Sequence, residues 1–108
     1  MPKYIFVYLG GNHPEDPEES KKHFEKYQGW LVGLGDAVVS PAIPFKDTHT
    51  VQPNGTAEIG TTTLMSGMSI LQFDSMQDAL KAAKACPFRD INGTLEVSEM
   101  VEMPTKLN

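Results

Sequence analysis

The sequence predicts an α+β protein with a ferredoxin-like β-α-β-β-α-β sandwich, in which a four-stranded antiparallel sheet carries two helices on one face. Three observations lead to this class. The runs 4–9 and 68–73 have apolar residues at both odd and even positions, which is typical of central strands covered on both faces. Two segments with helical periodicity, 17–34 and 76–85, each follow one of these runs. Strands expected at 37–40 and 95–103 complete the order, and their prolines or polar alternation mark them as edge strands.

The helix expected at 17–34 has a well-defined start. Asp16 is predicted as its N-cap, with Pro17 at the first helical position and Glu19 completing a capping box. One apolar stripe is expected to face the sheet, and it consists of Phe24, Tyr27, Leu31 and Leu34. Gly33 and Gly35 are expected to end the helix.

The remaining connections are predicted from turn and capping residues. The polar segment 45–63 is too long for a simple loop, so we expect a small hairpin of 49–52 against 56–59 around Asn54-Gly55. Ser75 is predicted to cap the second helix, with Asp78 as its reciprocal partner. Asn92-Gly93 is predicted to turn the chain into the last strand.

Composition favours a single domain spanning 1–108 and excludes some classes of partner. The chain is 40% hydrophobic, carries a net charge of −5 and has scattered basic residues, so neither nucleic acid nor an anionic membrane is an expected partner. The start of the chain does not resemble a signal peptide, and no apolar run approaches the roughly 18 residues of a membrane span, which favours a cytoplasmic protein. The single cysteine cannot form an internal disulfide.

The sheet face without helices needs a cover in a chain of this length. A second copy of the chain is the expected cover for this face, because a symmetric dimer buries the same surface of both chains. We therefore expect a homodimer in which the helix-free sheet faces pack against each other.

Six stretches resemble the YCII-related family of small dimeric α+β barrel proteins: the opening strand, "HFEKYQGWLVGLGDAV", "VVSPAIP", "SGMSILQF", "SMQDALKAAKA" and "CPFRDINGTLEV". The resemblance covers most of the chain. It implies a dimeric α+β barrel and, by analogy with some members, lyase or dehalogenase-like chemistry on small organic molecules. In that family a histidine on the first helix and an aspartate in an Asp-Pro-aromatic motif form the suspected catalytic pair. The histidine falls on His23, whereas the aspartate position is occupied by Cys86 in Cys86-Pro87-Phe88.

The predicted catalytic residues are therefore His23 and Cys86, and each has an alternative interpretation. His23 is either a general acid or base at the edge of a pocket or a boundary histidine on an amphipathic helix. Cys86 is either a nucleophile, alone or paired with His23, or a small buried residue continuing the apolar face of the second helix before Pro87 ends it.

A substrate-binding set accompanies them, namely Tyr27, Trp30, Ser40, Phe88 and Arg89. The three histidines share no ligand spacing, so we predict no metal site, and Gly10-Gly11 lacks the rest of a phosphate loop, so we predict no nucleotide or other cofactor. The first functional hypothesis is a homodimer with a small-molecule pocket and acid-base activity through His23. The alternatives are a non-catalytic small-molecule-binding or accessory module on the same scaffold, and a structural dimer without an enclosed pocket.

Overall fold

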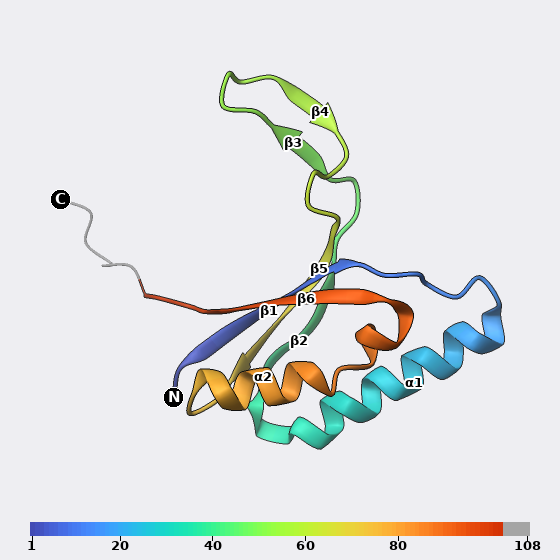
Figure 1. Cartoon of the computed structure of the whole chain (residues 1–108), viewed down its shortest axis with the longest axis vertical. Helices are drawn as coiled ribbons and strands as arrows, with labels where there is room; N and C mark the ends of the chain where they lie inside the picture. Colours follow the sequence, from blue (N-terminus) through green and yellow to red (C-terminus); the bar gives the residue numbers. More distant parts are fainter. Residues whose placement is uncertain (103–108) are drawn as a thin grey trace.

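A computed structural model describes residues 1–102 of the chain. Its elements are, in order, β1 (Lys3–Gly10), α1 (Pro17–Leu34), the 3₁₀ helix η1 (Gly35–Ala37), β2 (Val38–Pro44), β3 (His49–Val51), β4 (Ala57–Ile59), β5 (Met65–Gln72), α2 (Met76–Lys84), the 3₁₀ helix η2 (Pro87–Ile91) and β6 (Gly93–Glu99). The last strand was expected to span 95–103, but it begins earlier, at Gly93, and ends at Glu99, with residues 100–102 outside any strand. Met103, its predicted end, lies outside the described residues. Figure 1 shows the arrangement, with both helices on the same side of the sheet.

The four-stranded sheet has the order β2-β5-β1-β6, and every neighbouring pair is antiparallel. The two strands predicted to be central, β1 and β5, are central, and the two predicted edges are edges. Together with the helices on one face, this order confirms the predicted ferredoxin-like fold.

Strand parity divides the sheet into a helix side and a bare side. Along β1 the buried side chains are Tyr4, Phe6 and Tyr8, which therefore point toward the helices. Phe6 lies opposite Ser69 of β5, and Tyr4 lies opposite Leu71. The core forms where these side chains meet the alanines of α2 (Ala79, Ala82 and Ala83).

Helix α1 begins as predicted, but its inward face is rotated from the predicted stripe. The Asp16 side chain accepts a hydrogen bond from the Glu18 backbone N–H, so Asp16 is the N-cap. Phe24 is 58% exposed, and Trp30 rather than Leu31 packs against the core beside Leu34. The indole Nε1–H of Trp30 donates to the backbone carbonyl of Ala82 at 3.0 Å, which ties α1 to α2 and fixes this rotation.

Strand β2 is longer than predicted because Pro41 does not break it. The strand runs from Val38 to Pro44 along β5, with register shifts on both sides of Ser40. An edge strand tolerates proline, since a missing N–H on its outer side removes no ladder hydrogen bond.

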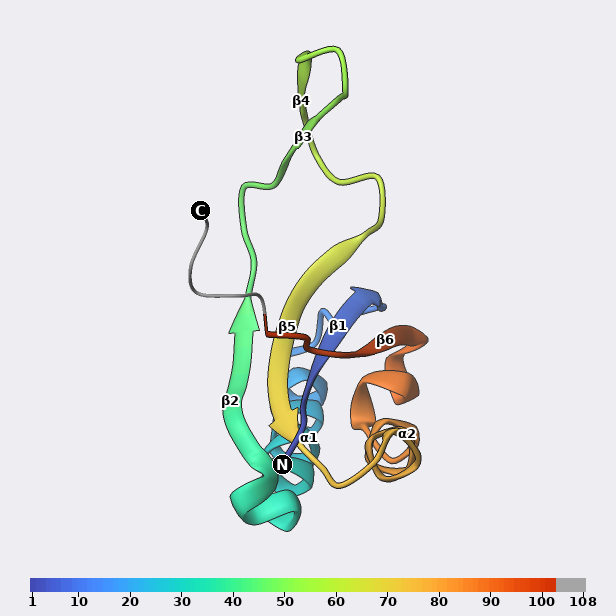
Figure 2. The same ribbon diagram turned by 90° about the vertical axis from the view of Figure 1, so that its left-hand side faces the viewer.

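The predicted hairpin is present and stands apart from the main sheet. β3 and β4 pair from His49 with Ile59 to Val51 with Ala57, close to the expected limits. The two strands continue away from the ends of β2 and β5, as Figure 2 shows from the side. Val51 and Ile59 are exposed, Ile59 to 89%, so one face of the hairpin is apolar and uncovered.

Helix α2 begins as predicted. The Ser75 side chain caps it by accepting a hydrogen bond from the Asp78 N–H.

The segment after α2 holds the last strand against the core. Asn92 adopts the left-handed conformation, with φ of 62°, and turns the chain into β6 at Gly93, as its sequence predicted. The buried Phe88 ring lies against Gly11 and Gly93, where any β-carbon would collide with it.

We predict that Gly93→Ala lowers the free energy of unfolding by about 1–3 kcal/mol, because the added methyl group forces the Phe88 ring out of its site. Urea denaturation followed by circular dichroism measures this change. Gly33→Ala in α1 is the matched control, since nothing lies within 4 Å of its added β-carbon. There we expect a gain of about 0.5–1 kcal/mol from the better helix propensity of alanine. An unchanged stability for Gly93→Ala would contradict the packing of Phe88 described above.

Candidate functional site

A cavity of about 600 Å³ opens beneath the first half of α1, on the helix side of the sheet. Its walls come from α1, β1, the end of β2 and the residue after it, β5 and η2. The lining residues are Tyr8, His13, Ser20, His23, Phe24, Tyr27, Ala42, Ile43, Pro44, Phe45, Ser66, Gly67 and Phe88. A cavity of this size with mostly apolar walls and a few polar groups has the character of a small-molecule site.

Helix α1 supplies one continuous face of the cavity. Ser20, His23, Phe24 and Tyr27 are spaced i, i+3, i+4 and i+7, so they lie on one side of the helix. Gly67 of β5 lies in the opposite wall, next to the backbone of β2. A β-carbon on Gly67 would lie 2.9 Å from the carbonyl oxygen of Ile43, so the absence of a side chain lets β2 pack closely here.

Three hydroxyl groups meet at the base of the cavity, two from the lining residues Tyr8 and Tyr27 and one from Ser69, which is buried behind them. The Tyr8 hydroxyl is 2.6 Å from the Tyr27 hydroxyl and 2.6 Å from Ser69 Oγ. The third side of the triangle, from Tyr27 to Ser69, is longer at 3.2 Å. Tyr8 and Ser69 are buried, whereas Tyr27 is half-buried. Burial raises the pKa of both tyrosines, so all three hydroxyls are protonated at neutral pH.

His23 has an environment that favours its neutral form. Partial burial is the largest cause that lowers the pKa of its imidazole, followed by the positive charge that His13 carries when protonated. The Asp90 carboxylate raises this pKa, and Lys26 lowers it. Lys26 and Asp90 are themselves 3.8 Å apart on the exposed surface. A neutral imidazole is the form that accepts a proton, so His23 is suited to act as a base.

Cys86 lies beneath this site and does not line the cavity. It is 2% exposed and packs in one cluster with Tyr8 and Phe88. Burial raises the pKa of its thiol to about 11, so the thiol stays protonated at neutral pH. Within residues 1–102, no hydrogen bond joins His23 to Cys86.

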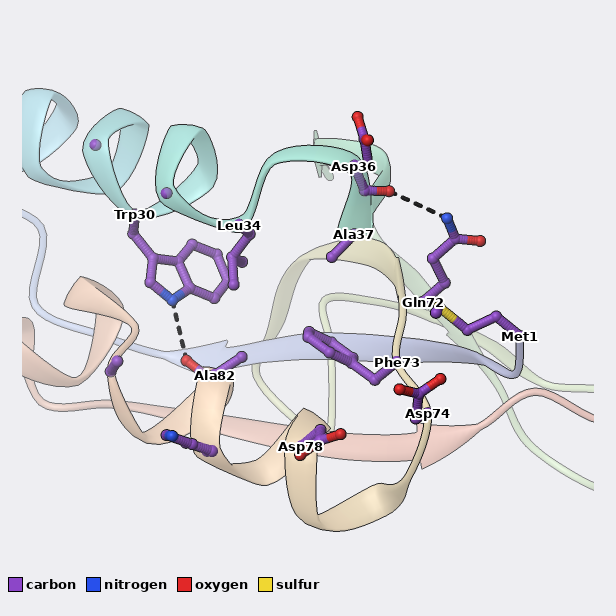
Figure 3. A pocket seen from close by; sticks show the side chains of 14 residues that line it. Met1, Trp30, Leu34, Asp36, Ala37, Gln72, Phe73, Asp74, Asp78 and Ala82 are labelled. Carbon is purple, nitrogen blue, oxygen red and sulfur yellow. Dashed lines mark hydrogen bonds between the residues drawn. The ribbon is translucent and has the colours of Figure 1, made fainter.

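Trp30, predicted as a binding residue, belongs to a different cavity. Its indole is turned toward α2, where it donates to Ala82, as Figure 3 shows. There it lines a second cavity, of about 650 Å³, with Leu34 and Phe73 at the opposite end of the helix pair. Trp30 therefore lines a different cavity from His23 and Tyr27, although its ring still packs against the Tyr27 ring, with the two centroids 5.5 Å apart.

Ser40 and Arg89 also lie away from the His23 cavity. Ser40 pairs with Ile70 near the middle of β2, and the cavity begins two residues later at Ala42. The Arg89 guanidinium donates to the backbone carbonyl of Lys84, and the residue lines a smaller cavity between α2 and β6. Of the five predicted binding residues, the structure places Tyr27 and Phe88 in the His23 cavity.

Sequence reasoning missed Tyr8, which lines the cavity, and Ser69, which is buried behind Tyr8 and hydrogen-bonded to it. A signal for both is present in the strand pattern. Tyr8 continues the parity of Tyr4 and Phe6, and Ser69 shares the parity of Leu71, so each places a hydroxyl on the buried side of a central strand. Buried hydroxyls need partners, and two on neighbouring strands indicate a shared polar site.

Within residues 1–102, no three histidine, cysteine, aspartate or glutamate side chains lie together in a way that would hold a metal ion. None of the helices in this part of the chain combines the length and apolar character needed to cross a membrane.

Fold and site together define a small ferredoxin-like α+β protein with a hydroxyl- and histidine-lined cavity under its first helix. No protein-family model matches the sequence, and no curated protein matches it. Among solved structures, the chain is similar to the 5-chloro-2-hydroxyhydroquinone dehydrochlorinase TftG from Burkholderia phenoliruptrix AC1100, in complex with 2,5-dihydroxybenzoquinone. The match has a TM-score of 0.57 at 11% sequence identity and covers 93% of this chain and 95% of that one. A likeness at this identity shows that the two chains share a fold.

We predict that the His23 ring titrates below the usual histidine value of about 6.5 in an NMR pH titration. His13→Gln is expected to raise this pKa by removing a nearby positive charge, and Asp90→Asn to lower it by removing a negative one. Because the folded-state value lies below the unfolded one, protonation of His23 favours the unfolded chain, so its effect on stability is a loss as the pH falls through about 6.5. Shifts of the opposite sign in the two variants would show that His23 lies elsewhere.

Proposed function

We propose that this protein binds a small organic molecule in the cavity under α1 and acts on it by acid-base chemistry of the lyase or dehalogenase kind, with His23 as the base. The observation that carries the proposal is the position of His23. Its imidazole, held toward the neutral form, lines the same aromatic cavity as the hydroxyls of Tyr8 and Tyr27. A base and hydrogen-bond donors in one cavity are the parts that proton abstraction requires.

The proposed step is an elimination, in which the substrate loses a proton and a leaving group and no other reagent is needed. The His23 imidazole takes a proton from a substrate carbon, and the released C–H electron pair forms the new double bond. The leaving group on the neighbouring carbon departs with its own bonding pair, as halide in a dehydrohalogenation. A dehydrochlorinase has the same fold, and this analogy supports an elimination as the class of reaction.

A second candidate is a non-catalytic binding or accessory module on the same scaffold, and the environment of Cys86 favours it. The family that the sequence resembles places an acid at this position, which would orient the histidine. Here a buried thiol with a pKa of about 11 stands in its place and does not reach the cavity. A histidine without that partner still binds ligands, but it is a weaker base.

The proposed assembly is a homodimer through the helix-free sheet face. Parity places one set of half-buried apolar side chains on that face: Ile5, Val7 and Leu9 from β1, with Met68 and Ile70 from β5. The β3–β4 hairpin, a separate two-stranded sheet, carries a further uncovered apolar side with Val51, Ala57 and Ile59. Burying both surfaces against a second copy removes them from water.

We predict that His23→Ala abolishes acid-base turnover of the substrate, because the variant lacks the proton acceptor. The measurement is chloride release from a panel of chlorinated phenols and hydroquinones, combined with thermal-shift binding of the same compounds. His49→Ala is the matched control, since His49 lies in the hairpin away from the cavity. Binding without chloride release in the wild type favours the accessory module, and full turnover by His23→Ala excludes His23 as the base.

We predict that the wild type sediments as a dimer at micromolar concentration and that Val7→Lys converts it to a monomer, because a buried, unpaired ammonium group opposes association. Analytical ultracentrifugation distinguishes the two states. Val32→Lys is the matched control, since Val32 is 79% exposed on α1. A monomeric wild type would exclude the dimer, and a dimeric Val7→Lys would place the interface elsewhere.

A further inference from the structure

The hydroxyl triangle at the base of the cavity has one weak side, and that side involves the residue nearest the cavity. The contacts from Tyr8 to Tyr27 and from Tyr8 to Ser69 are both 2.6 Å, whereas the contact from Tyr27 to Ser69 is 3.2 Å. Ser69 is completely buried and does not line the cavity, but Tyr27 does. The Tyr27–Ser69 hydrogen bond is therefore the one that a ligand can replace with the smallest loss of free energy.

Breaking that side leaves a directed chain of donors. Ser69 donates to the Tyr8 oxygen, Tyr8 donates to the Tyr27 oxygen, and the Tyr27 hydroxyl hydrogen is left to point into the cavity. Each hydrogen bond in such a chain polarises the next, so the terminal hydroxyl becomes a stronger donor than an isolated tyrosine. In the absence of a ligand the closed triangle satisfies all three hydroxyls, and no buried side-chain polar atom within residues 1–102 lacks a partner.

The surroundings of Tyr27 select the shape of the ligand. Tyr27 and His23 are one helical turn apart on the same face of α1 and line the same cavity, so one small molecule can contact both side chains. The rings of Phe24, Phe45 and Phe88 line the same cavity and favour a flat, conjugated body. A donor at one end of such a body requires an oxygen acceptor there.

We infer that Tyr27 is the hydrogen-bond donor for a phenolate or conjugated carbonyl oxygen of a planar ligand, with Tyr8 and Ser69 as positioning residues that act through it. This inference rests on the proposed function, because it assigns the substrate class of the same cavity. It assigns separate duties to the two ends of the ligand: Tyr27 binds the oxygen, and His23 faces the carbon that loses a proton. A hydrogen bond donated to an oxygen that gains negative charge stabilises the transition state in which that charge develops.

The test compares two probes that differ by one group, 4-nitrophenol and 4-nitrotoluene. Calorimetric titration of the wild type is expected to show tighter binding of 4-nitrophenol by about tenfold to a hundredfold, the range for a hydrogen bond to a charged acceptor. Tyr27→Phe removes the hydroxyl and retains the ring, so this preference should disappear while 4-nitrotoluene binds as before. Ser69→Ala should reduce the preference in part. Tyr4→Phe, in the core cluster, is the matched control and should leave both affinities unchanged.

A spectroscopic readout separates donation from a structural effect. Donation to the phenolate lowers the pKa of bound 4-nitrophenol, and the absorption of its ionised form reports that pKa directly. We expect Tyr27→Phe to raise the bound probe's pKa and Ser69→Ala to raise it by less. If both nitro compounds bind equally and Tyr27→Phe changes neither, the inference is wrong and the cavity proposal stands. If neither compound binds the wild type, the inference and the ligand-binding proposal both fail.

Discussion

The alternation of side chains along two adjacent strands is the constraint on which the core and the site both depend. Every second residue of β1 and β5 faces the helices, so the size and polarity of that set decide what fills the space below them. On β5 the set shrinks from Leu71 to Ser69 to Gly67. The Leu71 end packs in the core with the alanines of α2. At the Gly67 end the backbone of Ile43 and Pro44 packs against the glycine, and all three residues line the cavity. The helix-facing side of β5 thus contributes to both the core and the cavity wall.

Helix α1 follows from the same gradient. Over the filled half, Trp30 and Leu34 pack against the core, and the indole hydrogen bond to Ala82 holds α1 to α2. Over the other half, Phe24 remains largely exposed and lines the cavity. The helix is held to α2 at one end and covers a cavity at the other, so a single small domain contains the candidate site.

Local sequence signals were sufficient to predict most of the fold, and tertiary contacts explain the exceptions. Strand parity, the caps at Asp16 and Ser75, and the Asn92-Gly93 turn depend on neighbouring residues, so the sequence predicted them correctly. The choice between Trp30 and Leu31 as the inward residue depends on a carbonyl 52 positions away, which periodicity cannot show. The continuation of β2 through Pro41 likewise depends on which side of the strand is unpaired.

The site was predictable only where one element supplied it. His23 and Tyr27 lie on one helical face, and the motif after α2 identified Phe88, so these three positions were accessible to sequence reasoning. Tyr8 and Ser69 are 61 positions apart in the sequence, and only the pairing of β1 with β5 brings them together. The predicted catalytic role of Cys86 remains a prediction, but its burial restricts the chemistry. A carboxylate at this depth, beside Tyr8 and Phe88, would require a compensating partner, whereas a neutral thiol packs without one. The residues that line the cavity must therefore carry any proton transfer, which makes His23 and the hydroxyls beneath it the groups that decide between catalysis and binding.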